Sequence, residues 1–542
     1  MKKLAALLVI VLALSLSGAA LAEAPDMSMT YCNPLNLPVI DVSTRLSEMP
    51  ESSDGILDAT SVNETLSLET MAPANARSLV RSTGALGSLR EDYTRTIADV
   101  FVYQVSDGTI YLYATGNMQD DATYGACWST TDYINWEYHQ MNLGVVAPTF
   151  VQIGEKYYFA GNNTPVYVSD SPVGPWEELG YFQMPDGTET TGFGDVNFFL
   201  DDDGRLYLTY SIGSPIMGCE LDPEDPTKIL TEPVALWYTN PSNEWERFGS
   251  GNQNSMCGYT EGSQIIKYNG VYYLQVATNG TENISYCIGV KKSTEGPLSG
   301  YAYQQNNPVT YDVDNFIPGV GHGCFLVDAD GNIVVFYTCC SLNGRRLGMD
   351  LCYIDENGDI VLDEATDTPQ LAPNLAADAG TGTDLGLACL TNVGGGYWAS
   401  SYAEGRTPVY ATDDSINTWW APDAQDEAPQ LAVGLKSVYD VYAIQTNWAE
   451  LGTAYTRNNA VQYTIEYFDL ETNDWELLVD KSDNTVANAI DYDVIDGGVR
   501  TIAIRLNILG STDNAPIGVY DLRVFGENST LAQEKGLWDL PR

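Results

Sequence analysis

A short pattern recurs five times in the central part of this chain and limits the folds open to it. In each copy a glycine turn is followed by a run of aromatic and β-branched residues, a composition that favours β-strands. The turn glycines are Gly108, Gly154, Gly204, Gly270 and Gly331, and their spacing of 46 to 66 residues is typical of propeller blades. Because each copy predicts a strand, a tight hairpin and a second strand, the five copies predict an all-β, five-bladed β-propeller.

A second repeated element supports the same register. Residues 171–176 and 293–298 share a Ser-x-x-Gly-Pro-apolar pattern after a predicted strand, in the second and fourth copies. The alternative all-β fold, two stacked sandwiches, does not explain the regular spacing. Residues 93–360 contain no convincing helical periodicity.

Charge excludes several classes of partner. The chain of 542 residues has 25 Lys plus Arg and 73 Asp plus Glu, a formal net charge of −48. Nucleic acid is excluded as a partner because a polyanion would be repelled, and an anionic membrane surface is disfavoured for the same reason. Charged residues are nevertheless only 18% and apolar residues 44%, so the chain can bury a large core.

The first residues predict a signal peptide over 1–22. Lys2 and Lys3 precede an apolar run at 4–16, and Ala20-Leu21-Ala22 is a small-residue cleavage motif. The alternative is an N-terminal membrane anchor, but the apolar run is shorter than the roughly 20 residues that span a bilayer. We therefore expect a secreted, extracellular protein without membrane insertion.

Composition divides the rest of the chain. We predict a propeller domain over 23–375, in which the Ser-, Thr-, Glu- and Ala-rich residues 41–92 form a linker-like insertion. Aromatic residues are missing from about 371–396, which predicts a domain boundary there. The ten cysteines lie mostly in apolar runs, so their redox state stays open, and only two histidines and no C-x-x-C pair disfavour a zinc cluster.

The first strands of the five units predict a site. In a propeller these strands line the axis, and their equivalent positions converge. We place Asp99, Asp195, Glu261 and His322 at these positions, with Ala147 in the second unit. A single acid is more often a turn or capping residue, but several ionisable residues in repeat register indicate a site, because buried carboxylates are costly unless they are used or paired.

These residues also carry a family resemblance. The chain from about Tyr31 to Asp359 resembles the five-bladed glycoside hydrolase family 43, the arabinofuranosidases, xylosidases and arabinanases. The matching segments are Ala98-Asp99 before Gly108, Asp195 before 201–204, Glu261-Gly262 before 267–274, and the outer-strand pattern 128–136. The resemblance implies Asp99 as general base, Asp195 as the carboxylate that tunes the acid, and Glu261 as general acid.

The resemblance implies further site residues. Arg345 is similar to the family's arginine near the sugar pocket, although Arg346 matches equally well, and Trp128 is a candidate substrate-binding residue. His322 is either a buried, hydrogen-bonded residue or the family's axial histidine that supports a calcium ion, and no organic cofactor is expected. An acid and a base on opposite sides of a funnel suit hydrolysis with inversion, which needs carboxyls roughly 6.5–9.5 Å apart.

Two departures from the family's pattern leave the subgroup within the family open. The family commonly has proline after the base and after the tuning carboxylate, whereas this chain has Val100 and Val196. A sialidase is the alternative propeller hydrolase, because Thr131-Asp132 before Trp136 faintly resembles its Asp-box. That box needs a glycine that is absent here.

Residues 395–527 resemble a discoidin-type (F5/8 type C, carbohydrate-binding family 32-like) jelly roll. The matching segments are 399–401, 413–420, 429–435 and 519–526. The resemblance implies a structural calcium near Asp414 and Thr418. Glycan binding through exposed aromatic faces such as Trp448 and a purely structural role are both open, and Trp419 and Trp420 are expected in the core.

Together these observations predict a secreted inverting glycoside hydrolase. Its expected substrates are α-L-arabinofuranosyl or β-D-xylosyl units of a neutral plant polysaccharide, which a strongly acidic surface would not repel. The alternative is a glycan-binding propeller without catalytic activity.

Overall fold

The computed structural model describes residues 26–40, 97–116, 125–211, 214–254, 258–313, 316–339, 345–379, 382–391, 395–416, 418–450, 460–511 and 517–528. The predicted signal peptide and the linker-like insertion lie outside the described residues, so both stay predictions. Within these ranges, no helix has the length and apolar character needed to cross a bilayer.

Five sheets follow one another along the chain, one for each copy of the sequence pattern, and their strands pair antiparallel except for one parallel contact in the third sheet. Four of them contain four strands in simple consecutive order, and the third is larger. The first sheet is β3 (Ala98–Gln104), β4 (Ile110–Thr115), β5 (Ala126–Thr130) and β6 (Glu137–Gln140). The second is β7 (Thr149–Ile153), β8 (Lys156–Ala160), β9 (Val166–Ser169) and β10 (Glu177–Gly180). The third is β11 (Phe182–Gln183), β12 (Glu189–Thr190), β13 (Gly194–Leu200), β14 (Leu206–Ser211), β15 (Ile216–Asp222), β16 (Asp225–Ile229) and β17 (Val234–Trp237). The fourth is β18 (Tyr259–Tyr268), β19 (Val271–Asn279), β20 (Cys287–Ser293) and β21 (Ala302–Tyr303). The fifth is β22 (Gly321–Val327), β23 (Ile333–Cys339), β24 (Arg346–Ile354) and β25 (Ile360–Val361).

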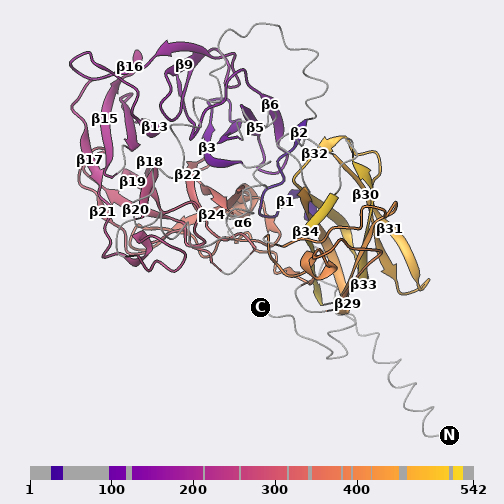
Figure 1. The fold of residues 1–542 in the computed structure, drawn as a ribbon. Helices are drawn as coiled ribbons and strands as arrows, with labels where there is room; N and C mark the ends of the chain where they lie inside the picture. Colours follow the sequence, from indigo (N-terminus) through magenta and orange to yellow (C-terminus); the bar gives the residue numbers. More distant parts are fainter. Residues whose placement is uncertain are drawn as a thin grey trace, which may run out of the picture.

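The sheets form a closed ring (Figure 1). The inner strand of each sheet contacts the inner strand of the next, in the order β3, β7, β13, β18 and β22, and β22 closes the ring onto β3. The predicted all-β propeller is confirmed. A short helix, α6 (Pro373–Ala379), follows the fifth sheet.

The repeated glycines form the hairpins between the inner strand of each sheet and the strand that follows it in the chain. Gly108, for example, has φ of 92° and donates its N–H to the Val105 carbonyl at 2.9 Å, and Gly331 has φ of 87°. Left-handed backbone of this kind is adopted without strain only by glycine. The aromatic and β-branched residues that follow are buried between neighbouring sheets; the largest apolar cluster, which contains Trp128, Phe150 and Phe336, joins the first, second and fifth sheets.

The C-terminal domain is a β-sandwich in which two strands of more than twenty residues carry most of the pairing. Its strands are β27 (Ala388–Cys389), β28 (Tyr397–Ala399), β29 (Gln430–Glu450), β30 (Val461–Asp469), β31 (Asp474–Lys481), β32 (Val486–Ala487), β33 (Ile490–Ser511) and β34 (Ile517–Asn528). Trp420, Leu431, Ile444 and Val524 lie in its core, so the prediction for Trp420 is confirmed.

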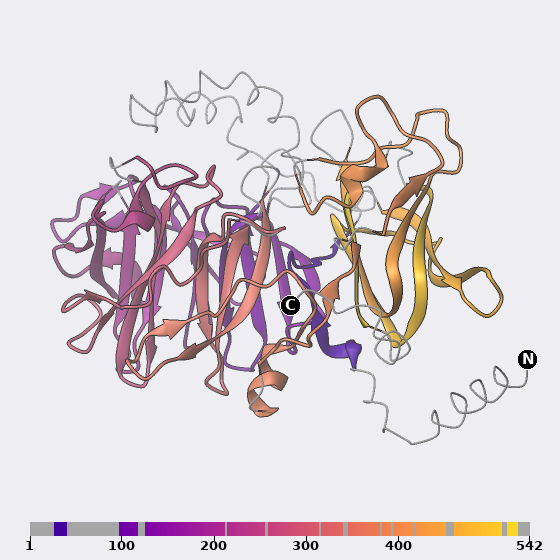
Figure 2. The same cartoon turned by 90° about the horizontal axis from the view of Figure 1, so that it is seen from below.

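The two domains are packed directly against each other (Figure 2). The N-terminal segment joins both: β1 (Thr30–Tyr31) pairs with β26 (Gln370–Leu371) beside the propeller, and β2 (Val39–Ile40) pairs with β32 of the sandwich. One apolar cluster contains Phe316 and Val335 of the propeller together with Tyr520 of the sandwich. The C-terminal domain is therefore not a module on a free tether.

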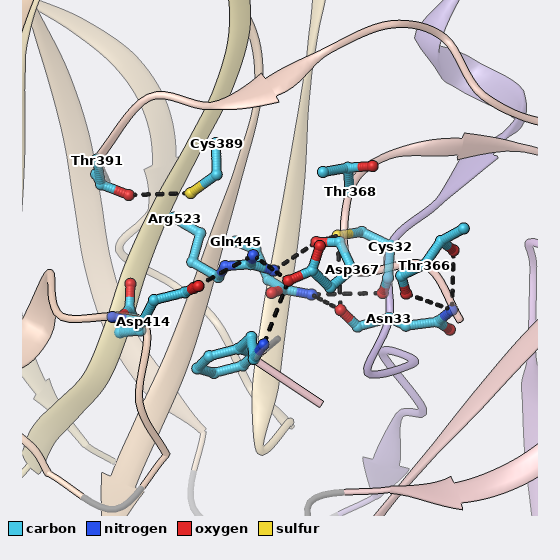
Figure 3. Close-up of polar contacts among 12 residues, drawn as sticks. Cys32, Asn33, Thr366, Asp367, Thr368, Cys389, Thr391, Asp414, Gln445 and Arg523 are labelled. Atoms are coloured by element: carbon cyan, nitrogen blue, oxygen red, sulfur yellow. Dashed lines mark hydrogen bonds and ion pairs between the residues drawn. The ribbon is translucent and has the colours of Figure 1, made fainter. Parts of the chain in front are cut away.

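A buried arginine crosses this boundary (Figure 3). Arg523 of β34 is 1% exposed, and its Nη2 lies 2.8 Å from Asp367 Oδ2 of the propeller side. Its guanidinium carbon lies 4.7 Å from the centre of the Phe316 ring. Nearby, Gln445 of β29 donates to the carbonyl of Cys32 at 3.4 Å.

Candidate active site

Five left-handed backbone positions, one from each sheet, lie near the propeller axis. Each inner strand contains, or is preceded by, one residue with positive φ: Asp99 (51°), Ala147 (48°), Asp195 (43°), Gly262 (57°) and His322 (33°). In four of the five sheets the pairing register shifts at this residue, as a β-bulge requires. Equivalent residues of all five sheets therefore converge on the axis, as the sequence predicts.

The prediction for the fourth sheet is wrong by one position. Gly262, not Glu261, occupies the left-handed position that Asp99, Asp195 and His322 share. Glu261 is the preceding residue and pairs with Ala277 of β19. Its carboxyl is still near enough to the axial residues for the charges of Asp195 and His322 to shift its pKa.

Side chains of neighbouring sheets hold the bulges. The Asp99 N–H donates to Thr338 Oγ1 of the fifth sheet at 2.9 Å, and that hydroxyl donates to the His322 carbonyl at 3.0 Å. The Ala147 N–H likewise donates to Thr115 Oγ1 at 2.7 Å, and the Asp195 N–H donates to Asn162 Oδ1. These contacts satisfy backbone groups that the bulges remove from the strand ladders.

Asp99 is surrounded by positive charge. Its Oδ1 lies 2.9 Å from Arg345 Nη1 and 3.3 Å from His322 Nδ1, and the residue is 7% exposed. Burial alone would raise the pKa of this carboxyl, but Arg345, His322 and a hydrogen bond from Thr115 outweigh burial and hold the pKa below its ordinary value. Asp99 is therefore ionised over most of the pH range, as a general base must be.

Glu261 has the opposite environment. Its Oε1 accepts a hydrogen bond from the Tyr286 hydroxyl at 2.7 Å. Burial, followed by the negative charge of Asp195, raises the pKa of Glu261 to about 7, and this exceeds the opposing effects of His322 and Tyr286. A carboxyl of this kind stays protonated in mildly acidic solution and can donate a proton.

Asp195 lies beside Glu261. Its Oδ2 accepts the Gly262 N–H at 3.0 Å, which fixes the carboxylate against the residue that follows Glu261. A small polar cavity on the axis is lined by Asp195, Asn197, His322 and the bulges at Ala147 and Gly262. The three acids predicted from the sequence thus converge on one place.

The order of the sheets separates Asp99 from Glu261. Asp99 lies in β3 and Glu261 in β18, and these strands are not neighbours in the ring; β22 with His322 lies between them on one side. The pair therefore consists of an ionised and a protonated carboxyl that face one axis from different sheets. This arrangement suits acid–base hydrolysis of a bond held between them.

Some residues predicted to contact a sugar are buried in the structure instead. Trp128 is fully buried in β5 and its Nε1 donates to the Pro38 carbonyl at 2.8 Å, so it packs the core and is not available to a sugar. Of the two arginines that the sequence left open, Arg345 contacts Asp99, whereas Arg346 Nη1 donates to the Arg345 carbonyl. Trp448 is 2% exposed with its Nε1 on Asp491 Oδ2, and it offers no face to a glycan.

The predicted metal-site residues lie in both domains. His322 contacts Asp99 through Nδ1, and the calcium predicted beside it stays a prediction. Asp414 and Thr418 lie in the sandwich, where the Thr418 hydroxyl donates to Asp413 Oδ2 at 2.7 Å. In the part of the chain that the structure describes, no three His, Cys, Asp or Glu side chains are grouped as metal ligands. No disulfide bond joins two of the described cysteines.

Sequence reasoning missed Tyr286 and the bulge-supporting residues. Tyr286 follows an irregular segment and belongs to none of the repeated strands, so no pattern pointed to it. Thr115 and Thr338, in contrast, both stand near the end of the second strand of their sheets. Their equivalent positions in the repeat could have revealed them.

Comparisons with known proteins show which families this chain resembles. The family described as "Glycosyl hydrolases family 43" matches residues 93–360, and "F5/8 type C domain" matches residues 397–521. A Vibrio protein named xylan 1,3-beta-xylosidase is 27% identical over 258 residues, which cover 40% of this chain and 42% of that relative. The chain thus spans less than half the length of this curated relative.

Solved structures are also similar. One named glycoside hydrolase is 19% identical, with a TM-score of 0.46 and coverage of 80% of this chain and 99% of that chain. A thermostable family-43 glycoside hydrolase is 23% identical, with a TM-score of 0.43 and coverage of 51% and 96%.

Proposed function

We propose that this chain, whose residues 93–360 belong to glycosyl hydrolase family 43, is a secreted, inverting glycoside hydrolase that removes α-L-arabinofuranosyl or β-D-xylosyl units from neutral plant polysaccharides. The observation that carries the proposal is the contrast between two carboxyls on one axis. Asp99 is held ionised by Arg345 and His322, and Glu261 is held protonated by burial and by Asp195.

The mechanism follows from these protonation states. Asp99 accepts a proton from a water molecule while the water oxygen attacks the anomeric carbon. Glu261 donates its proton to the glycosidic oxygen as the bond from that oxygen to the anomeric carbon breaks. The water enters on the face opposite the leaving group, so the configuration inverts. Asp195 supports the acid by keeping the pKa of Glu261 high. Its negative charge makes it unfavourable for Glu261 to lose a proton and become negative as well.

The substrate class rests on two observations. The curated relative is named a xylosidase, and the formal charge of −48 favours an uncharged polymer over an acidic one. The proposed secretion rests on the signal peptide pattern over residues 1–22. N-terminal sequencing of protein recovered from culture medium should begin at Glu23.

The test compares variants on an aryl arabinofuranoside, an aryl xyloside and linear arabinan. Asp99→Asn and Glu261→Gln should each lower kcat about 10²- to 10⁴-fold on the substrate that wild type hydrolyses. The exposed Asp203, in the hairpin of the third sheet, gives the matched control Asp203→Asn, which should keep full activity. Proton NMR should show the inverted anomer first; a retained anomer contradicts the assignment of Asp99.

The same variants separate hydrolysis from glycan binding alone. A binding protein would show affinity for one of these glycans without turnover in wild type, and neither substitution would have an activity to remove. That outcome would favour the non-catalytic alternative.

We also propose a structural calcium ion in the C-terminal domain, held by Asp414, Thr418 and Asp521. Asp521 Oδ1 is buried without a hydrogen-bond partner, and its Oδ2 accepts the Asp414 N–H at 2.7 Å. Carboxylate and hydroxyl oxygens are ligands that calcium prefers, and backbone carbonyls or water would complete the shell. Calcium should raise the melting temperature of wild type and not that of Asp521→Asn; equal shifts would exclude this site.

A further inference from the structure

The residue that contacts the proposed acid most directly is a buried tyrosine. Tyr286 stands immediately before β20, is fully buried, and donates its hydroxyl to Glu261 Oε1 at 2.7 Å. Burial, followed by the nearby Glu261, raises the pKa of Tyr286 well above its ordinary value. The hydroxyl therefore keeps its proton and acts as a hydrogen-bond donor to the carboxyl throughout the working pH range.

The fold fixes the tyrosine ring from two sides. A Cβ atom at Gly321, in the inner strand of the fifth sheet, would lie 2.3 Å from Tyr286 Cδ1, so the ring packs flush against that backbone. On its own sheet, the Tyr286 N–H donates to the Asn283 carbonyl at 3.0 Å. The hydroxyl thus has a defined position between the fourth and fifth sheets.

This contact distinguishes the two oxygens of the acid. Because Oε1 accepts the tyrosine hydrogen bond, the proton of the neutral carboxyl resides on Oε2. Once the proton has moved to the glycosidic oxygen, Oε1 belongs to a carboxylate, and the hydrogen bond from Tyr286 becomes charge-assisted and stronger.

We propose that Tyr286 is a positioning residue for Glu261: its hydroxyl holds the transferable proton on Oε2 and stabilises the carboxylate that forms as the proton leaves. The proposal rests on the proposed role of Glu261 as general acid. The groups that face Glu261 are Asp195 of the third sheet, His322 of the fifth, Asp99 of the first and Tyr286 itself. Of these, Tyr286 is the neutral hydrogen-bond donor.

Tyr286→Phe removes the hydroxyl and keeps the ring. With an unactivated disaccharide, whose leaving group needs a proton, kcat should fall about 10-fold, the value of one hydrogen bond to a charged group. With a 2,4-dinitrophenyl glycoside, whose leaving group departs unprotonated, kcat should change less than about 2-fold. The upper limb of the pH profile of kcat/KM reports the ionisation of Glu261. It should move to higher pH, because the lost hydrogen bond favoured the ionised form of Glu261.

The matched control is Tyr113→Phe in β4. Tyr113 is equally buried, and its hydroxyl donates to the Pro172 carbonyl at 2.8 Å, away from the acids. This variant should lose a similar amount of stability and keep both the leaving-group dependence and the pH profile. If Tyr286→Phe does not fold, 3-fluorotyrosine at position 286 keeps the ring and makes the hydroxyl a stronger donor. The upper limb should then move to lower pH.

The outcomes separate this proposal from the proposed function. Suppose that Glu261→Gln shows the leaving-group dependence. If Tyr286→Phe then lowers kcat equally on both substrates, or leaves the upper limb of the pH profile unchanged, Tyr286 has only a structural role. If Glu261→Gln itself shows no leaving-group dependence, Glu261 is not the acid and both proposals are wrong.

Discussion

Arg523 and Asp367 form an ion pair that joins the two domains, with 2.8 Å between Nη2 and Oδ2 and the arginine almost completely buried. Asp414 Oδ1 lies 3.4 Å from the same Nη2, so one guanidinium faces carboxylates from both domains. A buried pair of this kind is costly to break, because the remaining charge is left without compensation.

Replacing this arginine should therefore destabilise the whole chain. We expect Arg523→Met to lower the free energy of unfolding by about 3–5 kcal/mol. Arg500→Met is the matched control: Arg500 pairs with Asp440 in the same domain at 2.8 Å, but its side chain is 45% exposed, so its loss should cost at most about 1 kcal/mol. Denaturant unfolding of the full chain measures both, and equal effects would show that the interdomain pair is not a main stabiliser.

The left-handed glycine beside the acid provides a second prediction. Gly262 has φ of 57°, and a Cβ there would lie 2.9 Å from His322 Cδ2, whereas Gly270 has φ of 79° with no atom within 4 Å of its Cβ position. Both alanine variants should lose about 1–2 kcal/mol from the left-handed backbone. Only Gly262→Ala should also lower kcat/KM, by at least about 10-fold, because it displaces His322. The kcat/KM values of the two variants are compared under conditions in which the same fraction of each protein is folded. Full activity of Gly262→Ala would mean that the axial geometry tolerates movement.

The raised pKa of Glu261 also affects stability. The folded protein holds this proton up to about pH 7, whereas the unfolded chain releases it near the ordinary value of 4.5. Between these values the folded state binds more protons, so the contribution of Glu261 to stability falls as pH rises through this range. Glu261→Gln should therefore stabilise the protein at pH 8 by about 3 kcal/mol and leave it nearly unchanged at pH 4. Thermal unfolding at the two pH values tests this, and an equal gain at both would contradict a raised pKa.

The parts of the fold that the sequence predicts are those set by local backbone chemistry. Gly108 and Gly331 are needed in their turns whatever surrounds them, and the strands after them have aromatic and β-branched residues for the same local reason. The convergence of Asp99, Asp195 and His322 follows from the repeat, because equivalent positions in a closed ring must meet at its axis.

The parts that the sequence does not predict are set by packing between distant segments. Trp128 is a residue type on which sugars often stack, but its burial depends on the Pro38 segment, ninety residues away. The one-residue offset of Glu261 depends on which residue forms the bulge, and a glycine and an aspartate both adopt that backbone here. The joining of the domains through β2 and β32 involves two-residue strands without a pattern of their own.

Two adjacent arginines allow a test of how Asp99 is kept ionised. Arg345 Nη1 lies 2.9 Å from Asp99 Oδ1, whereas Arg346 Nη1 donates to the backbone carbonyl of Arg345. In the proposed mechanism the lower limb of the pH profile reports the ionisation of Asp99, and the upper limb, near pH 7, reports Glu261.

Removing the charge of Arg345 should move the lower limb alone. Burial raises the pKa of Asp99 and Arg345 is the largest factor that lowers it, so Arg345→Gln should shift the lower limb of kcat/KM to higher pH. The limb set by Glu261 should stay near pH 7, because the largest influences on the pKa of Glu261 are burial and the charge of Asp195. Arg346→Gln removes the same charge one residue away and should leave both limbs in place. A lower limb that moves equally in the two variants would mean that overall charge, and not the contact with Asp99, sets the pKa of the base.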